Sequence, residues 1–300
     1  MTTLSEAWNL YHSTILSNAT IRSIVTETGR WDNYIVPLIG KDDLGQITTL
    51  DIVKLRSCLQ KKKLSPQSVY HCLSLLRRVF NRAKEWDLFA GEIPPFDMPR
   101  FDNKRIRFLS PDEVQVLLDY LQWKNPAWHD IAVVGLYTGL RAGEIFKLTP
   151  SDVQLEKRFV TVLDTKNKAN RVVPLNDFSH SALEKNLRYH HPSSPIFPQL
   201  ACKTFSRAVE ACGFNTGVSD RRHRVVFHTL RHTFASWLVQ GGVPIALVSQ
   251  LLGHKDLKMT MRYAHLAPQQ AHEAVAYLAT IKPSNRNLKA QDSDTKTTIL

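Results

Sequence analysis

A proline-bearing segment, residues 91–107, constrains the fold most because it separates two long stretches of helical pattern. It reads GEIPPFDMPRFDNKRIR and contains Pro94, Pro95 and Pro99. Proline lacks the backbone donor that a helix or a central strand needs, and the segment shows no helical period. We therefore predict a linker at 91–107 between two domains, which a chain of 300 residues is long enough to form.

The part before the linker, residues 1–90, shows a helical pattern with little strand-like alternation. Its clearest element spans residues 65–86, where Ser65 suits a helix N-cap and Pro66 suits the first turn. Apolar residues then recur every three or four positions, as expected for one buried helix face. We predict a helical domain over residues 1–90.

The part after the linker begins with another helix signal and contains the only clear strand pattern. Ser110 and Glu113 have the spacing of a capping box, with Pro111 between them. Residues 159–163 and 171–173 are β-rich and are separated by the polar sequence TKNKAN, which predicts a hairpin. We predict a mainly α fold with a small antiparallel β-sheet: a mixed α/β domain at 108–281 and a polar tail at 282–300.

The charge of the chain indicates a polyanionic partner. Lys and Arg number 39 against 27 Asp and Glu, which gives a formal net charge of +12 and a pI of about 9.6. Such a surplus is typical of nucleic-acid binding. No apolar run approaches the roughly 20 residues that span a bilayer, and the N-terminus lacks the pattern of a secretory signal. We expect a cytoplasmic, nucleoid-associated protein with no membrane partner.

The densest group of reactive side chains lies in FHTLRHTFASWL and LLGHKDLKMTMRYAHL. His228 and Arg231 are three residues apart and share a helix face. His228 and His232 also form an HxxxH pair, but the metalloprotease version has a glutamate where this chain has Thr229. No third ligand or carboxylate cluster is evident, so we predict neither a metal nor another cofactor. Cleaving a nucleic-acid strand without a metal requires another source of positive charge, for which arginine is suited.

Four motifs in order resemble the tyrosine site-specific recombinases, and most closely their phage integrase branch. The resemblance covers residues 108–266 through its motifs, and the first domain more loosely through its helical pattern. The motifs are TGLRAGEI with Arg141, TKNKANRVVPL with Lys166, HTLRH with His228 and Arg231, and LGHKDLKMTMRYAH with His254 and Tyr263.

The resemblance implies a catalytic role for each of these residues. Arg141 and Arg231 would hold the nonbridging oxygens of a phosphodiester through planar forks of donors. Tyr263 would be the nucleophile, and His228 would accept its proton. Breaking the DNA strand in this way needs no external energy source, because the phosphotyrosyl bond retains the energy of the ester.

The remaining roles are also those that the resemblance implies. Lys166 would protonate the leaving 5′-oxygen, with Lys168 on the same turn as the alternative acid. His254 would add a hydrogen bond to the phosphate. Glu144 lies three residues after Arg141 and is interpreted as a partner of the active-site arginines or histidine rather than a base.

The DNA contacts are predicted from basic side chains outside the catalytic set. For any one of them the alternative is a solvated charge. They are Arg77, Arg78 and Arg82 in the first domain, Lys104 and Arg105 in the linker, and Arg222 and Arg224 before the HTLRH motif.

The resemblance implies site-specific recombination, either integration or excision, through a 3′-phosphotyrosyl intermediate and a Holliday junction. The partners implied are double-stranded DNA with a specific core site, a homotetramer on two duplexes and accessory DNA-bending or directionality proteins. The alternatives are a chromosome-dimer resolvase, a type IB topoisomerase-like relaxing activity and a noncatalytic DNA-binding protein.

Overall fold

The computed structural model describes residues 2–102, 107–164, 169–187, 193–197, 203–268, 275–276 and 280. The chain divides into two compact units, Met1–Asn103 and Lys104–Leu300. The predicted tail at 282–300 lies outside the described residues.

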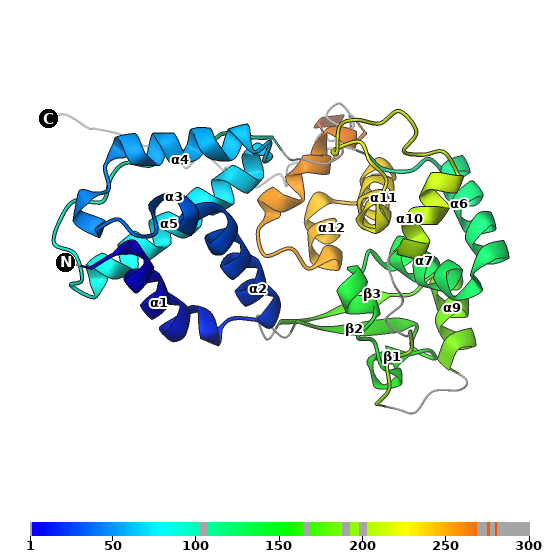
Figure 1. The fold of residues 1–300 in the computed structure, drawn as a ribbon. Coiled ribbons are helices and arrows are strands. Elements are labelled where there is room, and N and C mark those ends of the chain that lie inside the picture. The colour runs from blue at the N-terminus through cyan, green and yellow to red at the C-terminus, as the bar shows by residue number, and fades with distance from the viewer. Residues whose placement is uncertain are drawn as a thin grey trace, which may run out of the picture. The chain divides into compact units, whose positions relative to one another are not determined.

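The N-terminal unit is helical, as its pattern predicts. Its longest helix confirms the expected start: Ser65 is the N-cap and accepts a hydrogen bond from the Ser68 amide, and Pro66 occupies the first turn. Trp8 stacks on Trp31 in the core, with ring centroids 4.3 Å apart. The helices of this unit in Figure 1 are α1 (Leu4–Thr14), α2 (Ile21–Arg30), α3 (Val36–Ile39), α4 (Thr49–Lys61) and α5 (Pro66–Glu85).

Much of the segment predicted as a linker belongs to the N-terminal unit. Ile93, Phe96 and Met98 pack against the core of this unit, and Arg56 forms an ion pair with Asp97. The absence of a helical period correctly indicates irregular backbone. It does not exclude burial, because apolar side chains on an irregular segment pack as well as those on a helix.

The C-terminal unit begins with the predicted capping box. Ser110 accepts a hydrogen bond from the Glu113 amide, and the Glu113 carboxylate accepts one from the Ser110 amide. The helices of this unit in Figure 1 are α6 (Pro111–Lys124), α7 (Pro126–Thr138), α8 (Ala142–Ile145), α9 (Asp177–Leu187), α10 (Lys203–Ala211), α11 (Phe227–Gln240) and α12 (Ile245–Leu252).

The predicted hairpin is present and carries one additional strand. Strand β2 (Phe159–Asp164) pairs antiparallel with β3 (Ala169–Pro174), with Val160 opposite Val173. A two-residue strand β1 (Val153–Gln154), which the sequence did not predict, pairs with the other edge of β2. The predicted fold class, mainly helical with a small antiparallel sheet, is confirmed.

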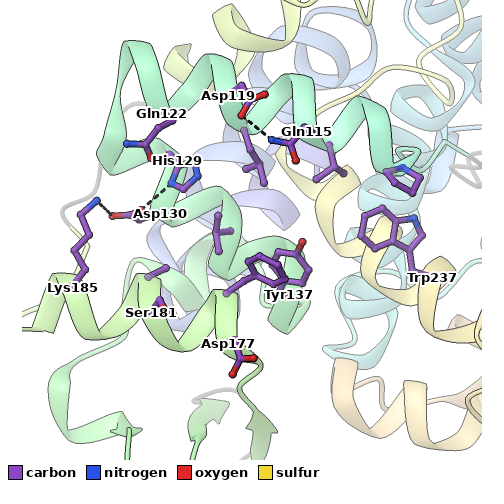
Figure 2. Close-up of a pocket in the computed structure, with 16 residues that line it drawn as sticks. Gln115, Asp119, Gln122, His129, Asp130, Tyr137, Asp177, Ser181, Lys185 and Trp237 are labelled. Carbon is purple, nitrogen blue, oxygen red and sulfur yellow. Dashed lines mark hydrogen bonds and ion pairs between the residues drawn. The ribbon is translucent and has the colours of Figure 1, made fainter.

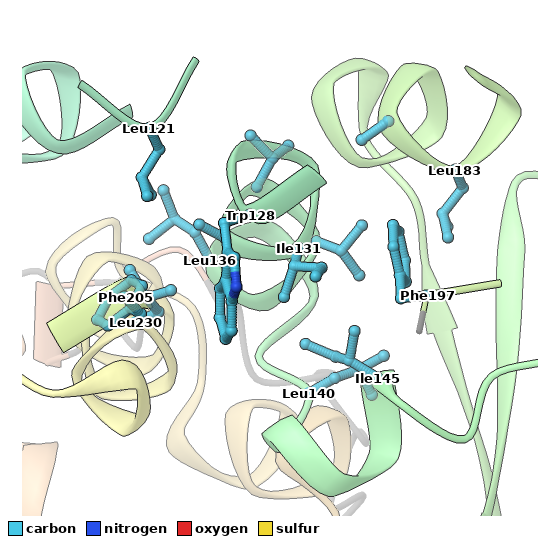
Figure 3. Close-up of a cluster of buried hydrophobic side chains, with 14 of the residues drawn as sticks. Leu121, Trp128, Ile131, Leu136, Leu140, Ile145, Leu183, Phe197, Phe205 and Leu230 are labelled. Carbon is cyan, nitrogen blue, oxygen red and sulfur yellow. The ribbon is translucent and has the colours of Figure 1, made fainter. Parts of the chain in front are cut away.

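Two apolar clusters hold the C-terminal unit together. Figure 3 shows Trp128 of α7 in the middle of the larger cluster, with Ile131, Phe205 and Leu230 around it. The smaller cluster joins α11 and α12 to Tyr263. Within the described part of the chain, no helix is long and apolar enough to cross a membrane.

Candidate active site

Arg141 is placed by a tight turn between α7 and α8. Gly139 ends α7 with φ 65°, a conformation that favours glycine. A Cβ at Gly139 would also meet Phe234 at 2.5 Å. Arg141 is the N-cap of α8, and Glu144 accepts hydrogen bonds from both its backbone amide and its guanidinium, each at 2.8 Å. The structure thus places Glu144 against Arg141, where the motif spacing predicts a partner.

Glu144 is also bound by a second arginine, Arg171 of β3, which sequence reasoning did not identify. The Arg171 guanidinium donates to both Glu144 oxygens, at 3.1 and 2.7 Å, and its Nε donates to the Leu251 carbonyl at 3.1 Å. These bonds join β3 to α8 and to the end of α12. Although burial opposes ionisation of Glu144, the hydrogen bonds and charges of the two arginines hold its pKa below the usual value.

Arg231 on α11 is almost fully buried, with 3% of its surface exposed. Its guanidinium donates to the carbonyls of Gly139 and Leu252, each at 2.6 Å. It therefore connects the turn that carries Arg141 to the turn that precedes His254. Burial and the nearby Arg141 charge lower its pKa to about 9, so it still carries its charge at neutral pH.

His254 follows a second left-handed glycine, Gly253, which ends α12 at φ 64°. The ring Nδ1 of His254 lies 2.7 Å from the hydroxyl oxygen of Thr260, a buried residue that the sequence did not single out. Burial, with the charges of Arg231 and Arg141, lowers the pKa of His254 to about 4. At neutral pH the ring is uncharged and suited to hydrogen bonding rather than to charge pairing.

Tyr263 lies on the short helical segment Met261–Leu266 and is 6% exposed. Its hydroxyl is hydrogen-bonded to Nδ1 of His232, with 2.5 Å between the two atoms. Burial raises the pKa of Tyr263, while the charges of Arg262 and Arg231 act in the opposite direction. His232 is therefore also a residue of the site, although the sequence analysis considered it only as a possible metal ligand together with His228.

His228 lies one turn before His232 on α11 and is exposed. Its ring meets the His232 ring edge-on, with 4.9 Å between centroids. In the structure it is thus His232, rather than His228, that is hydrogen-bonded to the hydroxyl of Tyr263.

The described catalytic candidates are brought together although the sequence spreads them from 141 to 263. The charges of Arg141, Glu144, Arg171 and Tyr263 all act on Arg231, and those of Arg231, Arg141, Arg262 and His228 act on His254. A site with several guanidiniums around a phenol suits a phosphate group. The two candidate acids, Lys166 and Lys168, lie outside the described residues.

The predicted DNA contacts are placed on the two units as follows. In the N-terminal unit Arg77 is exposed, while Arg78 contacts Glu27 and Tyr11 and Arg82 pairs with Glu85. In the C-terminal unit Arg222 pairs with Asp220, and Arg224 is exposed. Lys104 and Arg105 lie outside the described residues.

A cavity of about 790 Å³ lies elsewhere, between α6, α7 and α9. Figure 2 shows Asp130, His129 and Lys185 at one end of it and Tyr137 and Trp237 at the other. Its size and apolar lining are typical of a small-molecule site, but none of the predicted catalytic residues line it. We place the chemistry instead at the arginine cluster, Arg141, Arg171 and Arg231, because its positive charges complement the negative charge of a phosphate. Among the described residues, no three His, Cys, Asp or Glu side chains are grouped to hold a metal ion.

Comparison with known proteins agrees with the motifs. The chain is 31% identical over 226 residues to the integrase of Salmonella phage P22, which covers 70% of this chain and 56% of that protein. It is 30% identical over 275 residues to a tyrosine recombinase of Pseudothermotoga lettingae, which covers 89% of this chain and 94% of that protein. The chain thus spans little more than half the length of the phage P22 relative.

Solved structures show the same fold at low sequence identity. The Tn1549 transposon integrase in complex with transposon right end DNA matches with a TM-score of 0.76 and 17% identity, covering 93% of this chain and 100% of that one. A lambda integrase tetramer bound to a Holliday junction matches with a TM-score of 0.73 and 18% identity, covering 87% of this chain and 77% of that one. Residues 107–270 match the model of the phage integrase family, and with these relatives they show that the chain belongs to that family.

Proposed function

We propose that this protein is a site-specific DNA recombinase that cleaves and rejoins strands through a covalent bond between Tyr263 and a DNA 3′-phosphate. The observation that carries the proposal is that Tyr263 is buried beside His232, where the charges of Arg262 and Arg231 act against the rise in its pKa that burial causes. A phenol is a weak nucleophile while protonated. The charges of Arg262 and Arg231 stabilise the phenolate against the effect of burial, and guanidiniums also attract the phosphate that it attacks.

The two arginines act on the nonbridging oxygens of the phosphate. Arg141 donates a hydrogen bond to Glu144, and Arg231 donates to the carbonyls of Gly139 and Leu252. Guanidiniums fixed before the substrate arrives stabilise the charge that develops on a five-coordinate phosphorus without further reorganisation. His254, uncharged at neutral pH, adds a hydrogen bond to the same phosphate.

In the cleavage step the Tyr263 oxygen bonds to phosphorus and the bond from phosphorus to the 5′-oxygen breaks. The phenolic proton goes to a histidine, a role that the resemblance assigns to His228, and the 5′-oxygen takes a proton from Lys166. Attack by a 5′-hydroxyl of another strand reverses these steps. The ester energy is kept throughout, so the exchange requires no nucleotide.

The role of Lys166 is tested with a substrate that carries sulfur at the 5′-bridging position, because a thiolate leaves without an acid. Lys166→Ala is expected to cleave this substrate nearly as fast as the parent protein and to cut the ordinary ester roughly 10² to 10⁴ times more slowly. Rescue of Lys168→Ala instead would assign the acid to Lys168. Absence of rescue in both variants would place the acid elsewhere.

On DNA, we propose that the helical N-terminal domain and the catalytic domain both contact a duplex core site, and that Lys104 and Arg105, which stand near the junction of the two domains in the sequence, contact its phosphates. Four copies would hold two duplexes and exchange one pair of strands at a time through a Holliday junction. The lambda integrase relative was solved as a tetramer on such a junction. The biological role that fits this reaction is integration or excision of DNA in the cytoplasm. Accessory DNA-bending or directionality proteins would assist it.

The proposal is tested first by selecting the site. A pool of nicked duplexes with random sequence around the nick is incubated with the protein, and DNA that stays bound after denaturation is sequenced. Two copies of the selected duplex are then combined with the protein. Exchanged strands and a junction intermediate are expected. Relaxation of a supercoiled plasmid without exchange would instead indicate a topoisomerase, and binding without a covalent product would indicate a noncatalytic protein.

A further inference from the structure

The hydrogen bond between Tyr263 and His232 joins the predicted nucleophile to a buried base. The two atoms are 2.5 Å apart, and the residues are 6% and 4% exposed, respectively. A phenol carries its proton at neutral pH. In the imidazole tautomer that is protonated on Nε2, the hydroxyl therefore donates and Nδ1 accepts.

The groups that face this pair come from the segment before α6, from the helical segment Met261–Leu266 and from α11. A cavity of about 20 Å³ beside it is lined by Arg107, Ser236, Arg262 and His265, which is room for about one water molecule. Arg107 is paired with Glu113, and Arg262 donates to the Met259 carbonyl at 3.0 Å. On α11 itself, the His228 ring lies edge-on to the His232 ring.

Burial raises the pKa of Tyr263, and the nearby positive charges partly offset this effect. Arg262 and Arg231 act electrostatically to stabilise a phenolate at position 263. A base acts efficiently when it lies within hydrogen-bond distance of the proton that it removes. Among the described residues, Nδ1 of His232 is the side-chain nitrogen that has a hydrogen bond to this hydroxyl.

We propose that His232 is the catalytic residue that accepts the phenolic proton of Tyr263 during cleavage and returns it during ligation. The inference rests on the function proposed above and changes one assignment in it. As the bond from Oη to phosphorus forms, the proton moves to Nδ1 of His232, and the bond from phosphorus to the 5′-oxygen breaks while Lys166 protonates that oxygen. In ligation a 5′-hydroxyl returns its proton to Lys166 and bonds to phosphorus, while the Tyr263 oxygen leaves phosphorus and recovers the proton from Nδ1.

The placement of His228 supports the change. His228 is exposed, whereas His232 and Tyr263 are buried together. A residue on the open side of α11 is better placed to meet DNA than to remove a proton from a buried hydroxyl. His228 then contributes through contacts to the substrate.

The central variant is His232→Asn, because the asparagine Oδ1 takes the position of Nδ1 and accepts a hydrogen bond but cannot take up a proton. His228→Asn is the matched control one turn away on α11. Single-turnover formation of the covalent adduct is measured on the selected nicked duplex. We expect His232→Asn to be slower by roughly 10² to 10⁴-fold at neutral pH, with DNA affinity and the melting temperature close to those of the parent protein.

A second measurement separates proton transfer from positioning. Fluorinated tyrosines, whose phenols are more acidic, are incorporated at position 263. They are expected to restore most of the rate of His232→Asn and to change the parent rate little. The rate of His232→Asn is also expected to rise about tenfold for each pH unit, because hydroxide must then remove the proton.

Three results would overturn the inference. The first is a rate of His232→Asn within threefold of the parent, and the second is a lower rate that does not respond to pH or fluorination, which would leave only a positioning role. The third is rescue of His228→Asn by fluorination, which would assign the proton to His228. Failure of the parent protein to form any adduct would reject the proposed function itself, and is distinguishable from all of these.

The inference is also testable with both histidines intact, should the asparagine variant fold poorly. The rate of the parent protein is followed from pH 5 to pH 9 with tyrosine and with fluorotyrosine at position 263. If His232 accepts the proton, the acidic limb of the profile keeps its midpoint, because that limb reports the histidine. A midpoint that falls with the acidity of the phenol would show that the proton is lost to solvent before attack.

Discussion

The exchange Glu144→Gln tests whether one carboxylate holds the arginine cluster together. Glu144 accepts hydrogen bonds from the Arg141 amide, the Arg141 guanidinium and both terminal nitrogens of Arg171. Glutamine keeps one acceptor oxygen, so it loses two of these four bonds, and its amide hydrogens would face the donors of a guanidinium. It also leaves Arg171, whose side chain is 11% exposed, without an opposite charge.

The expected cost follows from these contacts. A hydrogen bond to a charged group contributes about 1.5 to 3 kcal/mol, which gives roughly 3 to 6 kcal/mol for two such bonds. Because the Glu144 side chain is 18% exposed, water replaces part of the loss. We expect the catalytic unit to be destabilised by about 3 kcal/mol.

Hydrogen exchange followed by mass spectrometry measures this cost for each unit separately. Amides of α8, β3 and α12 are expected to exchange roughly a hundredfold faster, since about 1.4 kcal/mol corresponds to a factor of ten. Peptides from the N-terminal unit serve as an internal reference, and Glu156→Gln, at an exposed position of the same unit, is the control. A change below about 0.5 kcal/mol, or one equal to that of the control, would refute the reasoning.

Three further predictions concern the turns and the buried groups of the site. Gly253→Ala is expected to lower the melting temperature, because the residue has φ 64° and a Cβ would lie 2.8 Å from Arg171 Cδ; an unchanged melting temperature would show that the turn tolerates a side chain. The low pKa of His254, about 4, means that the unfolded state binds its proton first, so stability is expected to fall as pH drops from about 6.5 to 4 by up to about 1.4 kcal/mol per unit. Denaturant titrations of His254→Gln at several pH values are expected to show a smaller loss of stability between pH 6.5 and 4 than the parent protein shows. An identical dependence of stability on pH would contradict the low pKa of His254. Arg231→Ala is expected to slow adduct formation by at least 10²-fold, and activity within tenfold of the parent would contradict its role.

Much of the fold was predictable because local rules decide it. The caps at Ser65 and Ser110 mark the starts of α5 and α6, and the alternating runs on either side of TKNKAN form β2 and β3. Strand β1 has only two residues, too few to show an alternating pattern. The packing of residues 93–98 on the N-terminal unit is a tertiary effect that the irregular local pattern does not reveal.

The candidate site was predictable through its motifs but not through its supporting contacts. Arg141, Arg231, His254 and Tyr263 stand in recognisable sequence patterns, and the structure brings them together. Arg171 stands among valines in a short strand, and nothing local shows that it faces Glu144 rather than solvent.

The assignment of the two histidines shows the same limit. His228 and His232 differ by about 40° around a helix, so the sequence leaves both near the same face. Which of them reaches Tyr263 depends on how the segment after α12 folds back onto α11, and that is decided by long-range packing.

The central claim, that Tyr263 is the nucleophile, is tested most directly by locating the covalent bond. The adduct formed on the selected nicked duplex is digested with protease and nuclease, and the modified peptide is sequenced by mass spectrometry. We predict a 3′-linked nucleotide on Tyr263, no adduct with Tyr263→Phe and duplex binding by that variant within a few-fold of the parent. A nucleotide on another residue, or an adduct formed by Tyr263→Phe, would contradict the account.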